Sequence, residues 1–88
     1  MNMTMKVKIL YFASLREALG ASGEELALPA GVDTVGALRA HLAARGEAWQ
    51  AMAGGRNLRA AVNQRMAGPE AAIAAGDEVA FFPPVTGG

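Results

Sequence analysis

Hydrophobic and polar residues alternate near the amino end of the chain, over residues 5–12. One side of this alternation consists of Met5, Val7, Ile9 and Tyr11. Two lysines begin the other side, which becomes apolar at Leu10 and Phe12. A period of two is typical of a β-strand with one buried face. We therefore expect a strand whose second face, at its apolar end, lies beneath the next segment or forms a docking surface.

A short helix and a second strand follow this first strand. Ser14 and Glu17 have the spacing of a capping box, which predicts that Ser14 is the N-cap, and Gly20 ends the helix. Residues 24–28 then form a strand with its leucines turned inward, since Pro29 and nearby turn residues end the run. The connection between the two strands is short, which favours antiparallel pairing.

The principal helix is predicted from residue 33 or 34 to residue 45. Its apolar residues recur at helical spacing and are Val35, Leu38 and Leu42. Gly46 is placed to end this helix. Trp49 and Met52 are three residues apart and predict one further helical turn that caps the core, before the glycines at 54–55 interrupt it.

A β-hairpin is predicted in the second half of the chain. Residues 58–62 alternate in the manner of a strand, residues 63–64 provide the turn, and residues 65–66 begin the return strand. Farther along, residues 69–75 form a loop or a single helical turn that is anchored by Ile73.

The last predicted strand spans residues 78–82, after a chain reversal at residues 76–77. Period two puts Val79 and Phe81 on the buried face and leaves Phe82 facing outward. We expect Phe82 to anchor a partner, because exposed aromatic side chains often carry interface energy. The alternative is that Phe82 packs beneath a local loop. Replacing Phe82 with alanine separates the two roles, since only the second predicts a large loss of stability.

The order of the predicted elements is strand, strand, helix and then two or three further strands. This order suits an α+β fold, with a mixed sheet of four to five strands and one main helix packed on one face. A β-grasp arrangement matches it and puts the first and last strands side by side at the centre of the sheet. We therefore expect one domain over residues 1–82, whose first four residues are frayed.

Residues 83–88 follow the last strand as a thin tail that ends in two glycines and a free carboxylate. Pro83 and Pro84 cannot donate ladder hydrogen bonds, so the sheet ends there and the tail is held away from it. Gly87 and Gly88 have no Cβ, so they fit a narrow channel and leave the terminal carbon unhindered. The tail reaches at most ~20 Å, enough to enter a neighbouring active site. We predict that another protein handles this tail.

Composition argues against several classes of function. The 88 residues include eight acidic and eight basic side chains, so the formal charge is zero and no basic cluster favours nucleic acid. The chain has no cysteine, which excludes disulfides, thiolate metal sites and cysteine nucleophiles. It shows no secretory signal and no apolar run of membrane-spanning length. We expect a cytoplasmic protein with no nucleic-acid or membrane partner.

The remaining polar residues do not assemble an active site in the sequence. His41 is most simply a surface histidine, because no second type of metal ligand clusters with it. Ser14 suits a cap better than a nucleophile, since no histidine is near it in sequence. Residues 54–56 lack the spacing and the lysine of a phosphate loop, and Glu24 and Glu25 are most simply a solvated strand edge. We expect no metal or cofactor on this chain, and no catalysis by the chain alone.

Two segments, GDEVAFFPPVTGG at residues 76–88 and AVNQ at residues 61–64, resemble a known family. They are similar to the small subunits of molybdopterin synthase, sulfur carriers of the ubiquitin-like β-grasp family. Less specific matches at residues 11–13, 15–17 and 34–39 extend the resemblance over nearly the whole chain.

The resemblance implies roles for the residues of the carboxy-terminal end. Gly88 would be adenylated by an E1-like activating enzyme that uses ATP, then converted to a thiocarboxylate that donates sulfur to cyclic pyranopterin monophosphate. Val85, Thr86 and Gly87 match the part of the tail that lies in the partner's channel. The family's docking positions fall on Phe82, Met66 and Arg16. The implied partners are the activating enzyme and the large subunit of the synthase, a heterotetramer.

Two other interpretations stay open. One is a carrier that serves thiamine, cysteine or another thiolated product, or a protein modifier joined to lysines through Gly88. The other is a β-grasp binding module whose glycine tail has no chemical role. A gain in mass on incubation with ATP, an activating enzyme and a sulfur source distinguishes a carrier from a binding module.

Overall fold

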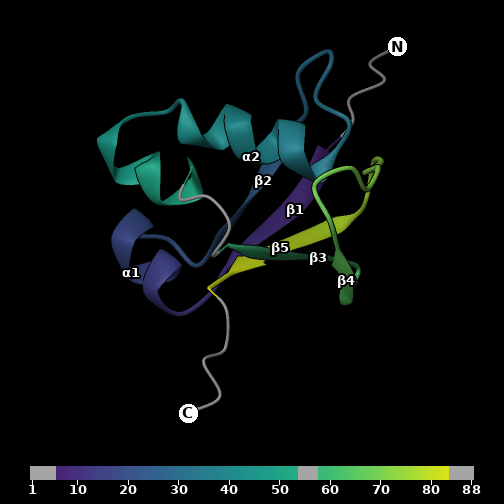
Figure 1. The fold of residues 1–88 in the computed structure, drawn as a ribbon. Coiled ribbons are helices and arrows are strands. Elements are labelled where there is room, and N and C mark those ends of the chain that lie inside the picture. The colour runs from purple at the N-terminus through teal and green to yellow at the C-terminus, as the bar shows by residue number, and fades with distance from the viewer. Residues whose placement is uncertain (1–5, 54–57, 84–88) are drawn as a thin grey trace.

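A computed structural model describes residues 6–53 and 58–83, as a five-stranded mixed sheet with two α-helices and a 3₁₀ helix packed against it (Figure 1). In chain order the elements are β1 (Lys6–Tyr11), α1 (Ser14–Leu19), β2 (Gly23–Ala27), α2 (Val35–Ala43), the 3₁₀ helix η1 (Glu47–Ala53), β3 (Arg59–Val62), β4 (Arg65–Ala67) and β5 (Glu78–Phe82). The strands are arranged in the order β2-β1-β5-β3-β4.

The strands β1 and β5 lie side by side at the centre of the sheet. β1 pairs antiparallel with β2 and parallel with β5, and β5 pairs antiparallel with β3. A parallel pair needs a long crossover connection, which the segment containing α2 provides here. These pairings confirm the predicted β-grasp arrangement. The division into a domain of residues 1–82 and a tail of residues 83–88 stays a prediction, because residues 1–5 and 84–88 lie outside the described part.

The hydrophobic core lies between one face of the sheet, called the inner face below, and the helices. The inner-face residues of the core are Val7, Ile9, Tyr11, Ala60, Val79 and Phe81. The helices and the loop before β5 add Leu15, Val35, Leu38, Leu42, Met52 and Ile73. Burying each large side chain contributes roughly 1.5–3 kcal/mol of hydrophobic stabilisation. The two periodicities predicted most of these residues, and Met52 and Ile73 were expected from the turns that contain them. Leu15 was not predicted, and Met5 lies outside the described residues.

The two α-helices begin differently, and the prediction for α1 was wrong in one respect. Ser14 is the first helical residue rather than the N-cap. The N-cap is Ala13, so no side chain caps this helix. Ala13 has φ 57°, so a sharp turn after β1 brings Ser14 directly into the helix. In α2, Thr34 is the N-cap, and its hydroxyl oxygen accepts a hydrogen bond from the Ala37 N–H at 3.1 Å.

The predicted helix ends are close to the observed ones. Gly20 ends α1 in the left-handed conformation, with φ 71°, and its N–H donates to the Arg16 carbonyl at 3.0 Å. α2 ends at Ala43, so two residues separate the helix from Gly46, which does not end it directly. No helix within residues 6–53 and 58–83 is long and apolar enough to span a membrane.

The predicted hairpin joins β3 to β4, and one of its turn residues also fixes the start of β5. Asn63 and Gln64 both have positive φ, 52° and 70°, as a two-residue type I′ turn requires. The side-chain nitrogen of Asn63, Nδ2, donates to Asp77 Oδ1 at 3.1 Å. The side-chain oxygen of Asn63, Oδ1, accepts from the Glu78 N–H at 3.0 Å. The turn is therefore held against β5, which sets the register of the central strands. The glycines at 54–55, predicted to interrupt the helical turn after Trp49, lie outside the described residues.

Candidate functional site

The face of the sheet opposite the core carries a row of apolar side chains. Leu10 on β1 is paired with Ala80 on β5, Ala80 with Ala61 on β3, and Ala61 with Met66 on β4. Each of these residues neighbours an inner-face residue along its strand, so the row lies on the outer side. Met66 is 65% exposed, an unusual fraction for a large apolar side chain.

Two phenylalanines extend this row toward the end of the sheet where the chain leaves β5. Phe12 follows β1, is 47% exposed, and its N–H donates to the Phe81 carbonyl at 3.2 Å. Phe82, the last residue of β5, is half-buried and pairs with Arg59 of β3. We call the set of Leu10, Phe12, Ala61, Met66, Ala80 and Phe82 the apolar outer face. It brings Phe82 and Met66, two predicted docking residues, onto one surface.

The other end of the same side of the sheet is charged. Lys8 of β1 lies between Glu25 of β2 and Glu78 of β5 in the strand register. Opposite charges on neighbouring strands stabilise a sheet modestly and keep its surface hydrated. The surface therefore changes from charged to apolar along the direction of β5, and the apolar end is the one from which the tail departs.

The other predicted site residues are divided between α1 and the end of the chain. Arg16 is exposed on α1, the helix that begins just after Phe12 and contacts β5. Figure 1 shows α1 near the end of β5 where the chain leaves the sheet. Val85, Thr86, Gly87 and Gly88 lie outside the described residues. Phe82 and Pro83 are thus the last described residues before the predicted reactive terminus.

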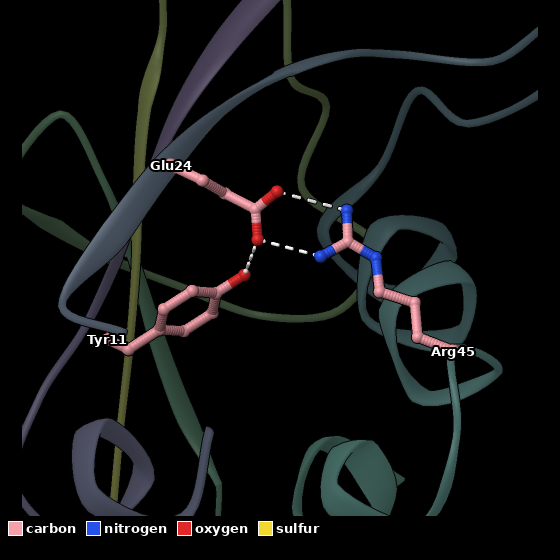
Figure 2. A network of polar contacts seen from close by, with 3 residues as sticks. All are labelled: Tyr11, Glu24 and Arg45. Atoms are coloured by element: carbon pink, nitrogen blue, oxygen red, sulfur yellow. Dashed lines mark hydrogen bonds and ion pairs between the residues drawn. The ribbon is translucent and has the colours of Figure 1, made fainter. Parts of the chain in front are cut away.

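A polar cluster that the sequence did not predict joins β1, β2 and the end of α2 (Figure 2). The Tyr11 hydroxyl donates to Glu24 Oε2 at 2.8 Å. The Arg45 guanidinium binds both oxygens of Glu24, with Nη1–Oε2 at 2.7 Å and Nη2–Oε1 at 3.0 Å. Trp49 covers this cluster, since Arg45 Cζ lies 4.7 Å from the centre of its ring and the Tyr11 ring meets it edge-on at 5.7 Å.

Glu24 is therefore not the solvated strand edge that we predicted, although Glu25 is exposed as expected. Glu24 has the same period-two position as Leu26, and both point toward the side of β2 that faces the core. A tyrosine at a core position also needs a partner for its hydroxyl. These two signals indicate an inward acidic partner for Tyr11, but they do not identify Arg45.

The cluster shifts the pKa values of its members away from neutrality. The hydrogen bonds from Arg45 lower the pKa of Glu24. Partial burial raises this pKa, and the hydrogen bond from Tyr11 lowers it further. Burial and the bond to Glu24 raise the pKa of Tyr11. The bond to Glu24 likewise raises the pKa of Arg45. All three groups keep their protonation state at pH 7, so the cluster stabilises the fold and has no poised acid or base.

Among the described residues, no group of three or more histidine, aspartate or glutamate side chains could hold a metal ion. His41 is half-buried on α2. The described part of the molecule thus offers an apolar surface beside the exit of a tail, rather than a set of groups suited to acid–base or metal chemistry.

A family model described as the ThiS family matches residues 9–88. The chain belongs to the ThiS family. Among curated proteins, this ThiS-family chain is similar to the molybdopterin synthase sulfur carrier subunit of Escherichia coli strain K12. The two are 46% identical over 82 residues, which cover 93% of this chain and 99% of that protein.

Solved structures with the same fold include two of particular interest. The crystal structure of SAMP1 from Haloferax volcanii matches with a TM-score of 0.75 and 30% identity, covering 94% of this chain and 99% of that one. A protein–protein complex of subunits 1 and 2 of molybdopterin-converting factor from Helicobacter pylori 26695 contains a chain that matches with a TM-score of 0.67. The two chains are 21% identical, and the match covers 96% of this chain and 100% of that one. This likeness shows the fold alone.

Proposed function

We propose that this ThiS-family chain carries sulfur for synthesis of the molybdenum cofactor and acts as the small subunit of molybdopterin synthase. One observation carries the proposal, the 46% identity to the Escherichia coli sulfur carrier subunit over 99% of that relative. The match spans the relative from end to end, so it does not depend on the two final glycines alone. The two final glycines, which leave the terminal carboxylate unhindered, agree with this proposal.

The reacting group in this proposal is the terminal carboxylate of Gly88. An ionised α-carboxylate has a pKa of about 3.3 to 3.7 and is a poor electrophile at neutral pH. Attack of a Gly88 carboxylate oxygen on the α-phosphate of ATP expels pyrophosphate and leaves an acyl-adenylate. Hydrosulfide from the sulfur source then attacks the acyl carbon and displaces AMP, which leaves a thiocarboxylate on Gly88. The ATP is bound by an E1-like activating enzyme, so this chain needs no cofactor of its own.

The thiocarboxylate sulfur attacks cyclic pyranopterin monophosphate in a pocket of the synthase large subunit, and water then cleaves the acyl–sulfur bond, which returns Gly88 as a free carboxylate. Val85, Thr86 and Gly87 occupy the channel that leads there, since a narrow tail presents the terminal carbon without steric hindrance. Covalent attachment to the carrier raises the local concentration of the sulfur donor at the acceptor. The large subunit supplies the acid–base groups.

The apolar outer face is the surface that holds these partners. Phe82 and Phe12 lie where the chain leaves the sheet, so a protein that accepts the tail also meets both aromatic rings. Met66 is the most exposed large apolar side chain among the described residues. Aromatic and other large apolar anchors carry most of the energy in such contacts. Arg16 on α1 adds a charged contact at the edge.

Intact mass spectrometry tests the chemistry directly. The chain is incubated with ATP, an activating enzyme and a sulfur source, and the expected product is heavier by the replacement of one oxygen with sulfur. The variant that lacks Gly88 is the first control, and a variant extended by one phenylalanine after Gly88 is the second. Neither control should be sulfurated or support pterin conversion. Normal conversion by the extended variant, in the absence of proteolysis, would show that the free terminus is not the reacting group.

A second function, protein modification through Gly88, is favoured by the likeness to SAMP1 at 30% identity and a TM-score of 0.75. An isopeptide bond to a lysine uses the same activated carboxylate with an amine as the nucleophile. Recovery of the chain covalently joined to many lysines in cell extract would support this function. Recovery only with a synthase large subunit, together with loss of pterin conversion when Gly88 is deleted, would support the sulfur carrier.

A further inference from the structure

A groove of about 590 Å³ opens between α2 and the β3–β4 side of the sheet. Its apolar floor includes Val35, Leu58 and Phe81. Ala40 of α2 and Ala67 of β4 also line it, and these small side chains leave the space between helix and sheet unfilled. A volume of several hundred Å³ with an apolar floor is typical of a site that receives a large side chain or a small ligand.

Two basic residues line this groove, Arg39 and Arg59. The strand register pairs Arg59 with Phe82 of the outer side, so Arg59 lies at the rim where the groove meets the apolar outer face. The Arg39 Nε donates to the Met52 carbonyl at 2.5 Å, which holds this side chain between α2 and η1. Arg59 is exposed and forms no ion pair with an acidic side chain of residues 6–53 and 58–83. One carboxylate, that of Glu70, lies beside Gly68 at the rim. The lining itself is therefore apolar with a positive charge, which complements an apolar group next to a carboxylate.

The groove is continuous with the apolar outer face. Met66 belongs to that face and also lines the groove. Arg59 lines the groove and is the strand partner of Phe82. A protein bound over Phe82 and Met66 therefore reaches the groove by passing around the edge strand β4.

The apolar outer face is small for a lasting subunit contact. Its six residues are only the apolar part of that side of the sheet, and a stable interface uses roughly 20–30 residues and about 800 Å² on each side, so a subunit contact extends beyond these six. A brief encounter with an activating enzyme needs less surface than the contact between two subunits of one synthase. The subunit contact is therefore the one that needs the surface of the groove in addition to the apolar outer face.

We propose that the groove receives a segment of the synthase large subunit in which a large apolar side chain lies next to a carboxylate. This inference rests on the proposed function. The apolar side chain fills the space above Phe81 and Val35, and the carboxylate meets Arg59. The groove thereby adds affinity for the large subunit beyond that of the tail and the apolar outer face.

Filling the groove tests this proposal. Ala40 is exposed on α2, so Ala40→Phe places a ring in the groove without disturbing a buried residue. The matched control is Ala44→Phe, at an exposed residue that does not line the groove. Dissociation constants are measured by calorimetry with the full chain and the purified large subunit. We expect Ala40→Phe to weaken binding about tenfold or more, and Ala44→Phe to change it less than about twofold.

A charge pair gives a second measurement. Arg59→Glu should weaken binding to the large subunit by about tenfold and reduce its dependence on salt, because a carboxylate then faces a carboxylate. Arg65→Glu is the control, since Arg65 is exposed, carries the same charge and does not line the groove. If Ala40→Phe does not fold, as judged by thermal unfolding, Ala40→Glu replaces it, with the same tenfold loss expected from charge repulsion.

Equal affinities of Ala40→Phe and Ala44→Phe for the large subunit would overturn the proposal. A loss confined to the activating enzyme would overturn it as well, because the groove would then serve a different partner. The proposed function has its own readout, since thiocarboxylate formation and large-subunit binding are measured on the unaltered chain. Failure of the unaltered chain in both measurements would reject the sulfur carrier, whereas failure of the groove variants alone rejects only this inference.

Discussion

The two sides of the sheet are formed by the same alternating strands, but they differ in how far their apolar side chains are exposed to solvent. On the inner face, Ile9, Val79 and Phe81 have no exposed surface, because the helices cover them. On the outer side, Met66 and Phe12 expose about half or more of their surface, and none of the helices within residues 6–53 and 58–83 covers them. The difference shows that alternation specifies which residues share a face, whereas function depends on which face is left uncovered.

Polar residues also differ between the two sides. At the edge of the inner side, Tyr11, Glu24 and Arg45 satisfy one another and fix β2 to the end of α2. On the outer side, Lys8, Glu25 and Glu78 lie at one end, whereas the other end is apolar apart from Arg59, the strand partner of Phe82. The inner side is therefore closed and stable, and the outer side is available to a partner.

The largest expected effect is at Phe81, and its neighbour Phe82 provides the matched comparison. Phe81→Ala should lower the free energy of unfolding by about 3–5 kcal/mol, because it removes a fully buried ring and leaves a cavity. Phe82→Ala should lower it by about 1 kcal/mol, since Phe82 is half-buried on the outer side. Denaturant titration measures both. Similar losses for the two variants would show that the outer side is part of the core.

The next effect concerns binding, for which Phe82 is the residue of interest. Phe82→Ala should weaken binding to the synthase large subunit by about 10- to 100-fold, as expected when an aromatic anchor is removed. Titration calorimetry with the purified large subunit gives this value. Lys8→Ala, on the charged end of the same side, is the control and should change affinity less than about threefold. Unchanged affinity of Phe82→Ala would remove Phe82 from the docking surface.

A smaller effect is expected from the polar cluster. Glu24→Gln removes the charge that binds both nitrogens of Arg45, and it should cost about 1–2 kcal/mol of stability. Glu25→Gln is the control, because Glu25 is the exposed neighbour on the same strand, and it should cost less than about 0.5 kcal/mol. Thermal unfolding distinguishes the two, since 1 kcal/mol corresponds to about 4–8 °C in a domain of this size. Equal melting temperatures would mean that the cluster contributes nothing net.

The smallest effect is a dependence of stability on pH. The pKa of Tyr11 is raised in the folded chain, so its contribution is complete below the unfolded pKa of about 10 and is lost as the pH rises above it. The pKa of Glu24 is lowered, so its contribution is present above about pH 4.3 and is lost as the pH falls further. The stability difference between wild type and Tyr11→Phe should be constant from about pH 6 to 9 and shrink above pH 10, by at most about 1.4 kcal/mol per pH unit. A difference that stays constant to pH 11 would contradict a raised pKa of Tyr11.

Local patterns predicted most of the fold correctly because they depend on residues close in sequence. Period two assigned Val7, Ile9 and Tyr11 to the core, and the turn at residues 63–64 placed the hairpin. The cap of α1 was wrong because the turn at Ala13 puts Ser14 inside the helix. A capping box shows the spacing of two side chains, but it does not show where the backbone first becomes helical.

Local patterns did not predict contacts between residues that are far apart in sequence. Arg45 follows Glu24 by 21 residues, and their contact depends on how the end of α2 lies over β2. The groove likewise depends on the distance between α2 and β4, which neither element specifies alone. The predicted docking residues Phe82 and Met66 share a surface only through the pairings β5–β3 and β3–β4.

Local patterns along the chain specified the succession of strands and helices, most of the core residues, and a terminus suited to chemistry by another protein. Side-chain periodicity and turn preferences act over a few residues, so these features can be recognised along the chain. The tertiary structure alone decided that the uncovered side of the sheet is apolar beside the tail, that Glu24 is bound to Arg45, and that a groove lies next to Arg59. Each of these requires elements distant in sequence to pack at a particular distance, and local patterns carry no information about that distance.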